Sequence, residues 1–112
     1  MGTIYHVHVG HDWAPGDDLL SLYEVYGDAA YEMYAERWPD ARELAIYHAH
    51  YVHCHATLVE AVKYQSEYGG QILEIETDEL DVFIDRLEYP HPCVRDMIPA
   101  EYITQMAVAR RL

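Results

Sequence analysis

The residues best suited to do chemistry in this sequence are its histidines, most of which lie in two short segments. The chain has eight histidines in 112 residues. Six of them lie in the segments IYHVH and YHAHYVHCHA, at positions 6, 8, 48, 50, 53 and 55. A neutral imidazole can ligate a metal ion, and it can donate one hydrogen bond while accepting another. The two segments are therefore the candidate functional positions.

Alternation of residue types predicts that both segments are β-strands. In residues 3–9, both histidines share a face with Ile4, and Tyr5 and the valines share the other face. Residues 47–56 alternate with some irregularity. This divides their histidines between two faces, with His48 and His50 on one and His53 and His55 on the other. On this interpretation the histidines of the second strand cannot form one site.

Metal binding is the first chemistry to consider for these pairs. A His-x-His pair on a strand can ligate zinc with a third ligand from elsewhere, such as His91, Cys93 or Asp12. However, the sequence contains no Cys-x-x-Cys and no His-Glu-x-x-His motif, and no carboxylate in fixed register with the pairs. We therefore predict no metal site. The simpler interpretation is that most of the histidines are partly buried and hydrogen-bonded to the backbone.

The two cysteines offer little support for nucleophilic catalysis. Cys54 and Cys93 are too few for a disulfide framework and are predicted to be reduced thiols. Cys54 lies between two histidines, but neighbours on a strand point to opposite faces, so those imidazoles do not reach its sulfur.

The rest of the pattern predicts an α+β fold. Apolar residues three and four positions apart predict a helix capped by Asp17 and ending at Trp38, with a break at Gly27. A capping box at residues 57–60 predicts a second helix that ends at Gly69. Further strands are predicted at 71–76, 80–85, 93–97 and 102–109, with a single turn after Pro99.

Charge and length exclude several classes of protein. Twenty acidic residues against seven basic ones give a net charge of −13, which opposes binding to a nucleic-acid backbone. No stretch of about 20 apolar residues could span a membrane, and the N-terminus lacks the regions of a signal peptide. With no repeat or linker, residues 1–112 are predicted to form a single domain in the cytoplasm.

Three motifs resemble small ADP-ribosyltransferase-like domains, including the RNA 2′-phosphotransferases. IYHVH is similar to their opening Tyr-His-x-Thr strand, and MIPAEYI to their Ile/Val-Pro-Pro-Glu-Tyr-Ile turn into the last strand. YVHCHATLVEAVKYQSEYGGQILEIE resembles their strand, capped helix and apolar strand. The resemblance implies a small, split and strongly bent β-sheet core with two or three helices, and a cleft that binds NAD or an ADP-ribose group.

The resemblance also implies which residues would act. The first-strand histidine of the family hydrogen-bonds the ribose near the nicotinamide, and the matching residue is His6. A second-strand aromatic residue or histidine lines the nicotinamide side; here it is His53, with Tyr47 and Tyr51 as neighbours. Arg95 or a nearby acid is the candidate for assisting transfer, so His6, His53 and Arg95 are the implied catalytic residues.

The sequence also departs from the family pattern. His8 replaces the expected threonine, and the late stretch CVRDMIPAEYI offers only Arg95, Asp96 and Glu101 where transferases commonly place a Glu or an Arg. Loss of a positioned carboxylate would cost orders of magnitude in rate while leaving binding possible.

Three functions stay open. The first is an enzyme that transfers ADP-ribose from NAD to an unknown acceptor, and the second is a non-catalytic nucleotide-binding protein of the same fold. The third is an acidic interaction protein, such as a phage-encoded DNA mimic, that binds a basic protein through Glu24, Asp28, Glu32 and Glu36. Eleven tyrosines also leave room for a homo-oligomer.

Overall fold

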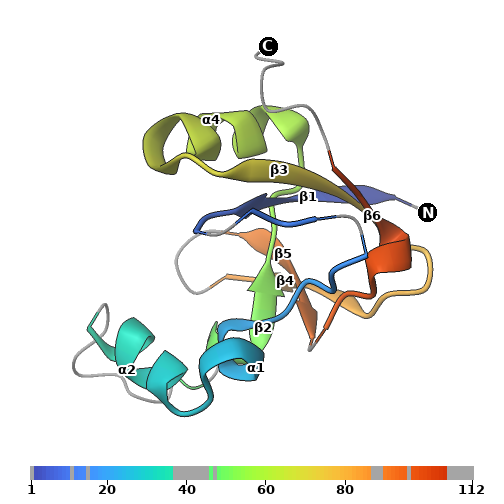
Figure 1. Cartoon of the computed structure of the whole chain (residues 1–112). Helices are drawn as coiled ribbons and strands as arrows, with labels where there is room; N and C mark the ends of the chain where they lie inside the picture. The colour runs from blue at the N-terminus through green and yellow to red at the C-terminus, as the bar shows by residue number, and fades with distance from the viewer. Residues whose placement is uncertain are drawn as a thin grey trace.

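Two small antiparallel sheets form the framework of the protein, seen in a computed structural model (Figure 1). The structure describes residues 2–10, 12–14, 16–36, 46, 48–86, 90–95 and 97–105. The first sheet has the order β1-β3-β6, with β1 at Thr3–His8, β3 at Gln71–Glu76 and β6 at Ile103–Gln105. The second has the order β2-β5-β4, with β2 at Tyr51–His53, β5 at His91–Arg95 and β4 at Val82–Asp85.

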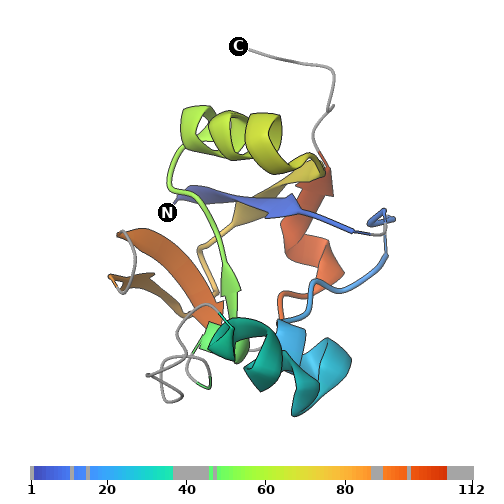
Figure 2. The same cartoon turned by 90° about the vertical axis from the view of Figure 1, so that its left-hand side faces the viewer.

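The helices lie at two ends of this framework. Helix α4, Leu58–Tyr68, covers the outer face of the β1–β3 pair. Helices α1, Leu22–Tyr26, and α2, Ala29–Ala35, lie at the opposite end of the molecule (Figure 2). A short 3-10 helix, η1, spans Ala100–Tyr102 directly before β6. The predicted α+β class is confirmed.

Strand alternation in β1 separates two apolar clusters. Ile4 packs between the two sheets, whereas Val7 packs under α4 with Ala61 and Ile72. The two histidines of β1 are on the Ile4 side of the strand, as predicted. The main core between the sheets contains Ile4, Trp13, Leu19, Val52, Cys54, Leu73, Ile75, Val94, Ile98 and Ile103.

A backbone bridge joins the first sheet to the chain that leaves the second. Tyr5 N–H donates to the His55 carbonyl at 2.9 Å, and His55 N–H donates to the Tyr5 carbonyl at 2.5 Å. Because β2 ends at His53, this bridge holds the end of β2 beside the middle of β1.

The strongest local signals in the sequence are confirmed. Thr57 caps α4, where its Oγ1 accepts from the backbone N–H of Glu60 at 3.2 Å, and Gly69 ends the helix at a positive φ of 74°. Strand β3 occupies the predicted residues 71–76. The turn after Pro99 is η1.

The predicted helix from Asp17 to Trp38 is wrong at its start. Helix α1 is capped by Ser21, whose Oγ accepts from the N–H of Glu24. Asp17 instead accepts from the N–H of Ala14 in a turn. Leu19 pairs with Ile98 through two backbone hydrogen bonds and is 2 % exposed, so core burial and strand pairing override the helical spacing.

Gly27 separates α1 from α2, as predicted. The four carboxylates at positions 24, 28, 32 and 36 are exposed, but they are divided between two short helices and do not form one continuous stripe. Trp38 lies outside the described residues.

The predicted strand at 47–56 is shorter than expected. Only residues 51–53 form β2, and residues 48 and 49 are helical. The alternation that separated His48 from His53 therefore does not apply, and the prediction that they lie on opposite faces is wrong.

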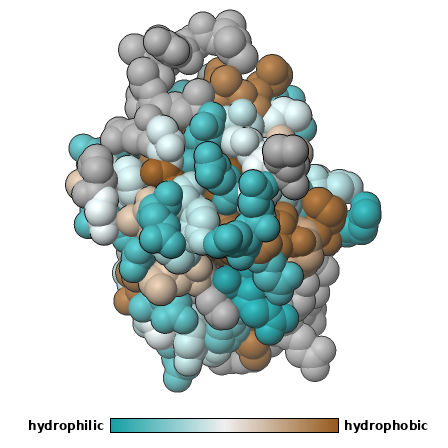
Figure 3. Space-filling model, turned by 90° about the vertical axis from the view of Figure 1, so that its right-hand side faces the viewer, coloured by the Kyte–Doolittle hydropathy of each residue, from teal (hydrophilic) through white to brown (hydrophobic). Residues whose placement is uncertain are grey.

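The surface carries most of the polar residues. On the face drawn in Figure 3, hydrophilic side chains gather in a central band with smaller hydrophobic patches at its border.

None of the helices in the described part of the chain is long and apolar enough to cross a membrane.

Gly70→Ala tests the close approach of β3 to β1. Gly70 has a φ of 104°, and a Cβ there would lie 2.5 Å from the His8 carbonyl oxygen. We expect the free energy of unfolding to fall by about 1–2 kcal/mol because of the positive φ, and by about 1–3 kcal/mol more because of the clash. Urea unfolding followed by circular dichroism measures this loss.

Gly69→Ala is the matched control, because Gly69 also has a positive φ but no atom lies within 4 Å of the added Cβ. The free energy of unfolding of Gly69→Ala should fall only by the amount expected for the positive φ, about 1–2 kcal/mol. Equal losses in the two variants would contradict the clash.

Candidate functional site

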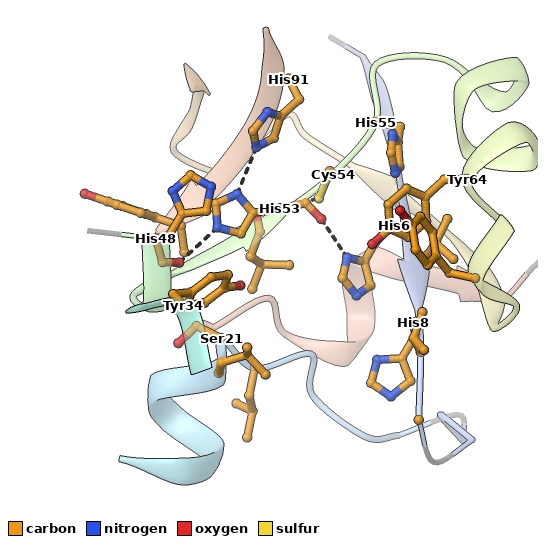
Figure 4. A pocket seen from close by; sticks show the side chains of 18 of the residues that line it. His6, His8, Ser21, Tyr34, His48, His53, Cys54, His55, Tyr64 and His91 are labelled. Carbon is orange, nitrogen blue, oxygen red and sulfur yellow. Dashed lines mark hydrogen bonds between the residues drawn. The ribbon is translucent and has the colours of Figure 1, made fainter. Parts of the chain in front are cut away.

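A pocket of about 670 Å³ opens between β1, β2, α1 and α4. Six of the seven histidines in the described part of the chain line it (Figure 4): His6, His8, His48, His53, His55 and His91. Small-molecule pockets have volumes of about 300–1,000 Å³, so this one is of ligand size.

His6 is held in one orientation by the backbone of β2. Its Nδ1 lies 2.8 Å from the His53 carbonyl oxygen. A carbonyl only accepts, so Nδ1 carries the proton and Nε2 carries a lone pair. Burial lowers the pKa of His6 to about 4. At neutral pH, His6 is therefore an uncharged imidazole whose Nε2 accepts hydrogen bonds.

The second sheet has one apolar face and one polar face. Val52 and Val94 are paired and belong to the core. Residues one position along point to the other face, where His53 lies opposite Cys93, and Asp85 lies opposite His91. The polar face gathers Tyr51, His53, Phe83, Asp85, His91, Cys93 and Arg95.

Three of these side chains and His48, from the helical turn before β2, form a tight group, here named the His/Asp cluster: His48, His53, Asp85 and His91. Each offers one ligand atom within 4.8 Å of the others. The Asp85 Oδ2 atom lies 3.6 Å from His48 Nδ1, 3.9 Å from His53 Nδ1 and 3.9 Å from His91 Nε2. His48 stacks on His53 with ring centroids 4.3 Å apart.

The protonation of His53 follows from its partners. Its Nε2 lies 2.9 Å from the His48 carbonyl oxygen, so Nε2 carries the proton. Nδ1 then accepts from His91 Nε2 at 2.9 Å. Burial, with smaller effects of His48 and His91, lowers the pKa of His53 to about 4, which keeps the ring neutral.

Cys93 lies beside this cluster but is not an activated nucleophile. Its Sγ is 3.1 Å from His53 Nδ1 and 4.0 Å from Asp85 Oδ2. Burial and the nearby Asp85 carboxylate raise the pKa of Cys93 to about 12. The thiolate needed for attack is therefore essentially absent at neutral pH. Burial also raises the pKa of Cys54, whose Sγ contacts the Val52 carbonyl.

Two of the histidines pack against aromatic rings away from the cluster. His50 lies 4.2 Å from the Tyr23 ring, and its Nε2 is 2.8 Å from the Tyr31 hydroxyl. His55 lies 5.0 Å from the Tyr64 ring of α4. His50 therefore supports α1 and α2, whereas His55 lies at the α4 side of the pocket.

The structure brings His6, Tyr51 and His53 to the pocket. His6 contacts the His53 backbone, while the His53 ring turns toward His91 (Figure 4). Arg95 is exposed and lies over the Tyr51 ring, 5.6 Å from its centroid, and does not line the pocket. Tyr47 lies outside the described residues.

Sequence reasoning missed the His/Asp cluster as a unit. The sequence offers His91 as one of three possible third ligands but predicts no metal site, and Asp85 belongs to no motif. Its role depends on the pairing of β4 with β5, which places it opposite His91. No protein-family model matches this chain, and no curated protein or solved structure matches it.

The lowered pKa of His6 predicts a pH-dependent stability. The unfolded chain takes up a proton near pH 6.5, but the folded chain does so only near pH 4. The free energy of unfolding should therefore fall as the pH falls through this range, by up to about 1.4 kcal/mol per pH unit for this one group.

The measurement compares urea unfolding of the wild-type protein and of His6→Gln at several pH values. Glutamine can still donate to the His53 carbonyl but does not titrate. We expect a shallower slope in His6→Gln, by about one proton. Identical slopes would show that His6 titrates normally.

Proposed function

We propose that this protein binds NAD or an ADP-ribose group in the pocket between β1, β2, α1 and α4, as an ADP-ribosyltransferase-like domain. The observation that carries the proposal is the fixed, neutral His6 in the wall of a ligand-sized pocket. The two small sheets, joined at Tyr5 and His55, fit the split sheet pair that the resemblance implies.

His6 suits a ribose because of its hydrogen-bonding pattern. Its Nδ1–H is committed to the His53 carbonyl, so Nε2 can accept from a ribose hydroxyl. This is the role that the resemblance implies for the first-strand histidine. An uncharged ring also avoids bringing a cation into the buried part of the pocket.

Aromatic side chains on two sides of the pocket suit the two ring systems of a dinucleotide. On the α4 side, Tyr64 and Tyr68 lie with centroids 4.6 Å apart, and both line the pocket. On the α2 side, Tyr34 lies edge-on to His48 at 5.4 Å and to His53 at 6.3 Å. Each wall offers a ring face or edge for stacking a base or nicotinamide.

The charged side chains that line the pocket attract this ligand only weakly. Lys63, the only lysine of the chain, lines the pocket on α4, where Glu60 and Glu67 also line it. One cation among two carboxylates attracts a diphosphate weakly. Binding would therefore depend mainly on hydrogen bonds and stacking.

Transfer of ADP-ribose is the second candidate, favoured by the unprotonated Nε2 of His6. The acceptor nucleophile would bond to C1′ of the nicotinamide ribose while the C1′–N bond breaks. Nicotinamide would leave with the bonding electrons, and His6 would take the proton of the acceptor.

We favour binding without turnover over transfer, because the described pocket lining offers no well-positioned carboxylate for catalysis. Among the described residues that line the pocket, the carboxylates are Glu60 and Glu67, both exposed on α4. Arg95 is engaged with Tyr51 outside the lining. An exposed carboxylate stabilises developing charge much less than a buried, preorganised one.

Ligand-induced thermal shifts test the binding proposal. NAD and ADP-ribose should each raise the Tm of the wild-type protein, and His6→Ala should remove the shift because the ribose loses its acceptor. His50→Ala is the matched control, since His50 packs on Tyr23 and Tyr31 and does not line the pocket. It should lower the basal Tm but keep the shift.

Absence of any shift in the wild-type protein, or an equal shift in His6→Ala, would rule out this binding mode. Release of nicotinamide from NAD, measured by chromatography, separates the two candidates. Turnover that is lost in His6→Ala would favour transfer, whereas a shift without release would favour binding alone.

A further inference from the structure

We propose that the His/Asp cluster is a four-ligand binding site for a zinc-type divalent metal ion. The ligand atoms would be His48 Nδ1, His53 Nδ1, Asp85 Oδ2 and His91 Nε2, and metal binding would move the proton of the His91 ring from Nε2 to Nδ1. This site is distinct from the nucleotide-binding role proposed for His6, and its test needs no nucleotide.

Four of the six distances between ligand atoms of the cluster lie within about half an ångström of those in a tetrahedral site, and all four atoms lie within 4.8 Å of one another. Zinc bonds of about 2.0–2.1 Å place neighbouring ligand atoms about 3.4 Å apart. The separations from Asp85 Oδ2 are 3.6, 3.9 and 3.9 Å, and His53 Nδ1 is 2.9 Å from His91 Nε2. Shifts of a few tenths of an ångström to about half an ångström would bring these pairs to the ideal spacing.

The orientation of His53 matches that of a metal ligand. Metal-binding histidines almost always donate the other ring N–H to a carbonyl or carboxylate, which fixes the tautomer. His53 Nε2–H donates to the His48 carbonyl, so its Nδ1 lone pair points at His91 and the centre of the cluster. Figure 4 shows the rings of His48, His53 and His91 gathered at one end of the pocket.

Burial separates this cluster from a chance gathering of surface side chains. His48, Asp85 and His91 are 3 %, 2 % and 4 % exposed. A carboxylate is seldom buried without a compensating charge or metal. A bound cation would place a positive charge directly beside Asp85 and between three imidazole rings.

The ligands come from four different segments, which a metal ion would tie together. His48 lies in the helical turn before β2, His53 ends β2, Asp85 ends β4 and His91 begins β5. Four protein ligands fill a tetrahedral shell, which is typical of a structural site. Three imidazoles and one carboxylate favour zinc over the hard ions magnesium and calcium.

The test uses the tag-free full chain, stripped with a chelator and titrated with Zn²⁺ in a calorimeter. We expect one Zn²⁺ per chain and a higher Tm with the metal. Co²⁺ should replace Zn²⁺ and give the intense visible bands of a tetrahedral complex. A thiolate-to-cobalt band would overturn the four-ligand assignment, because it would make Cys93 a ligand.

Two variants locate the site. Asp85→Asn and His91→Gln keep the size of the side chain and should each weaken Zn²⁺ binding by roughly 100-fold or more, above the loss expected for an outer-shell partner. His50→Gln is the control, since His50 lies near the cluster in sequence but bonds to Tyr31. It should bind like the wild-type protein.

The cobalt spectrum of the wild-type chain keeps the proposal testable even where a variant fails to fold. No Zn²⁺ binding by the wild-type protein, an octahedral cobalt spectrum, or equal affinities of His91→Gln and His50→Gln would each overturn it.

Discussion

The bridge between Tyr5 and His55 is the contact on which the site depends. It joins β1 of one sheet to the chain leaving β2 of the other through two backbone hydrogen bonds. These reciprocal hydrogen bonds set which residue of β1 lies opposite His55. With Tyr5 fixed opposite His55, the next residue of β1, His6, reaches the carbonyl of His53. The pocket lies at this junction. The same bridge therefore joins the two sheets and positions the histidine in the pocket wall.

His53 then connects the two halves of the site. Its backbone carbonyl holds His6 on the nucleotide side, and its ring lies between His48 and His91 on the cluster side. A shift of His53 would change both surroundings at once. The ring is stacked, hydrogen-bonded at both nitrogens and mostly enclosed, so it has little freedom to move. Such over-determined positions are what preorganise a site before any ligand arrives.

The sequence predicts the local elements of this fold better than its long-range contacts. The capping box at Thr57, the strand at 71–76 and the histidine face of β1 depend on short patterns, and all three are confirmed. The start of α1 could not be predicted, because Leu19 has helical spacing but pairs with Ile98, 79 positions away. The cluster was missed for the same reason. His48 lies in a helical turn and not in the predicted strand. Asp85 joins the cluster only because β4 pairs with β5 and places it opposite His91.

Charge links the two proposals. The chain has 20 acidic and seven basic residues, so its surface repels an anionic ligand, and the histidines with lowered pKa values add no positive charge at neutral pH. Lys63 attracts such a ligand only weakly, since Glu60 and Glu67 line the pocket on the same helix, α4. A divalent ion in the His/Asp cluster would lie at one end of the same pocket, because three of its four ligands line that pocket. Part of its charge would be offset by Asp85, but the remainder would act through a buried region of low dielectric, where screening is weak. The metal would therefore supply the positive potential that the side chains of this acidic protein do not.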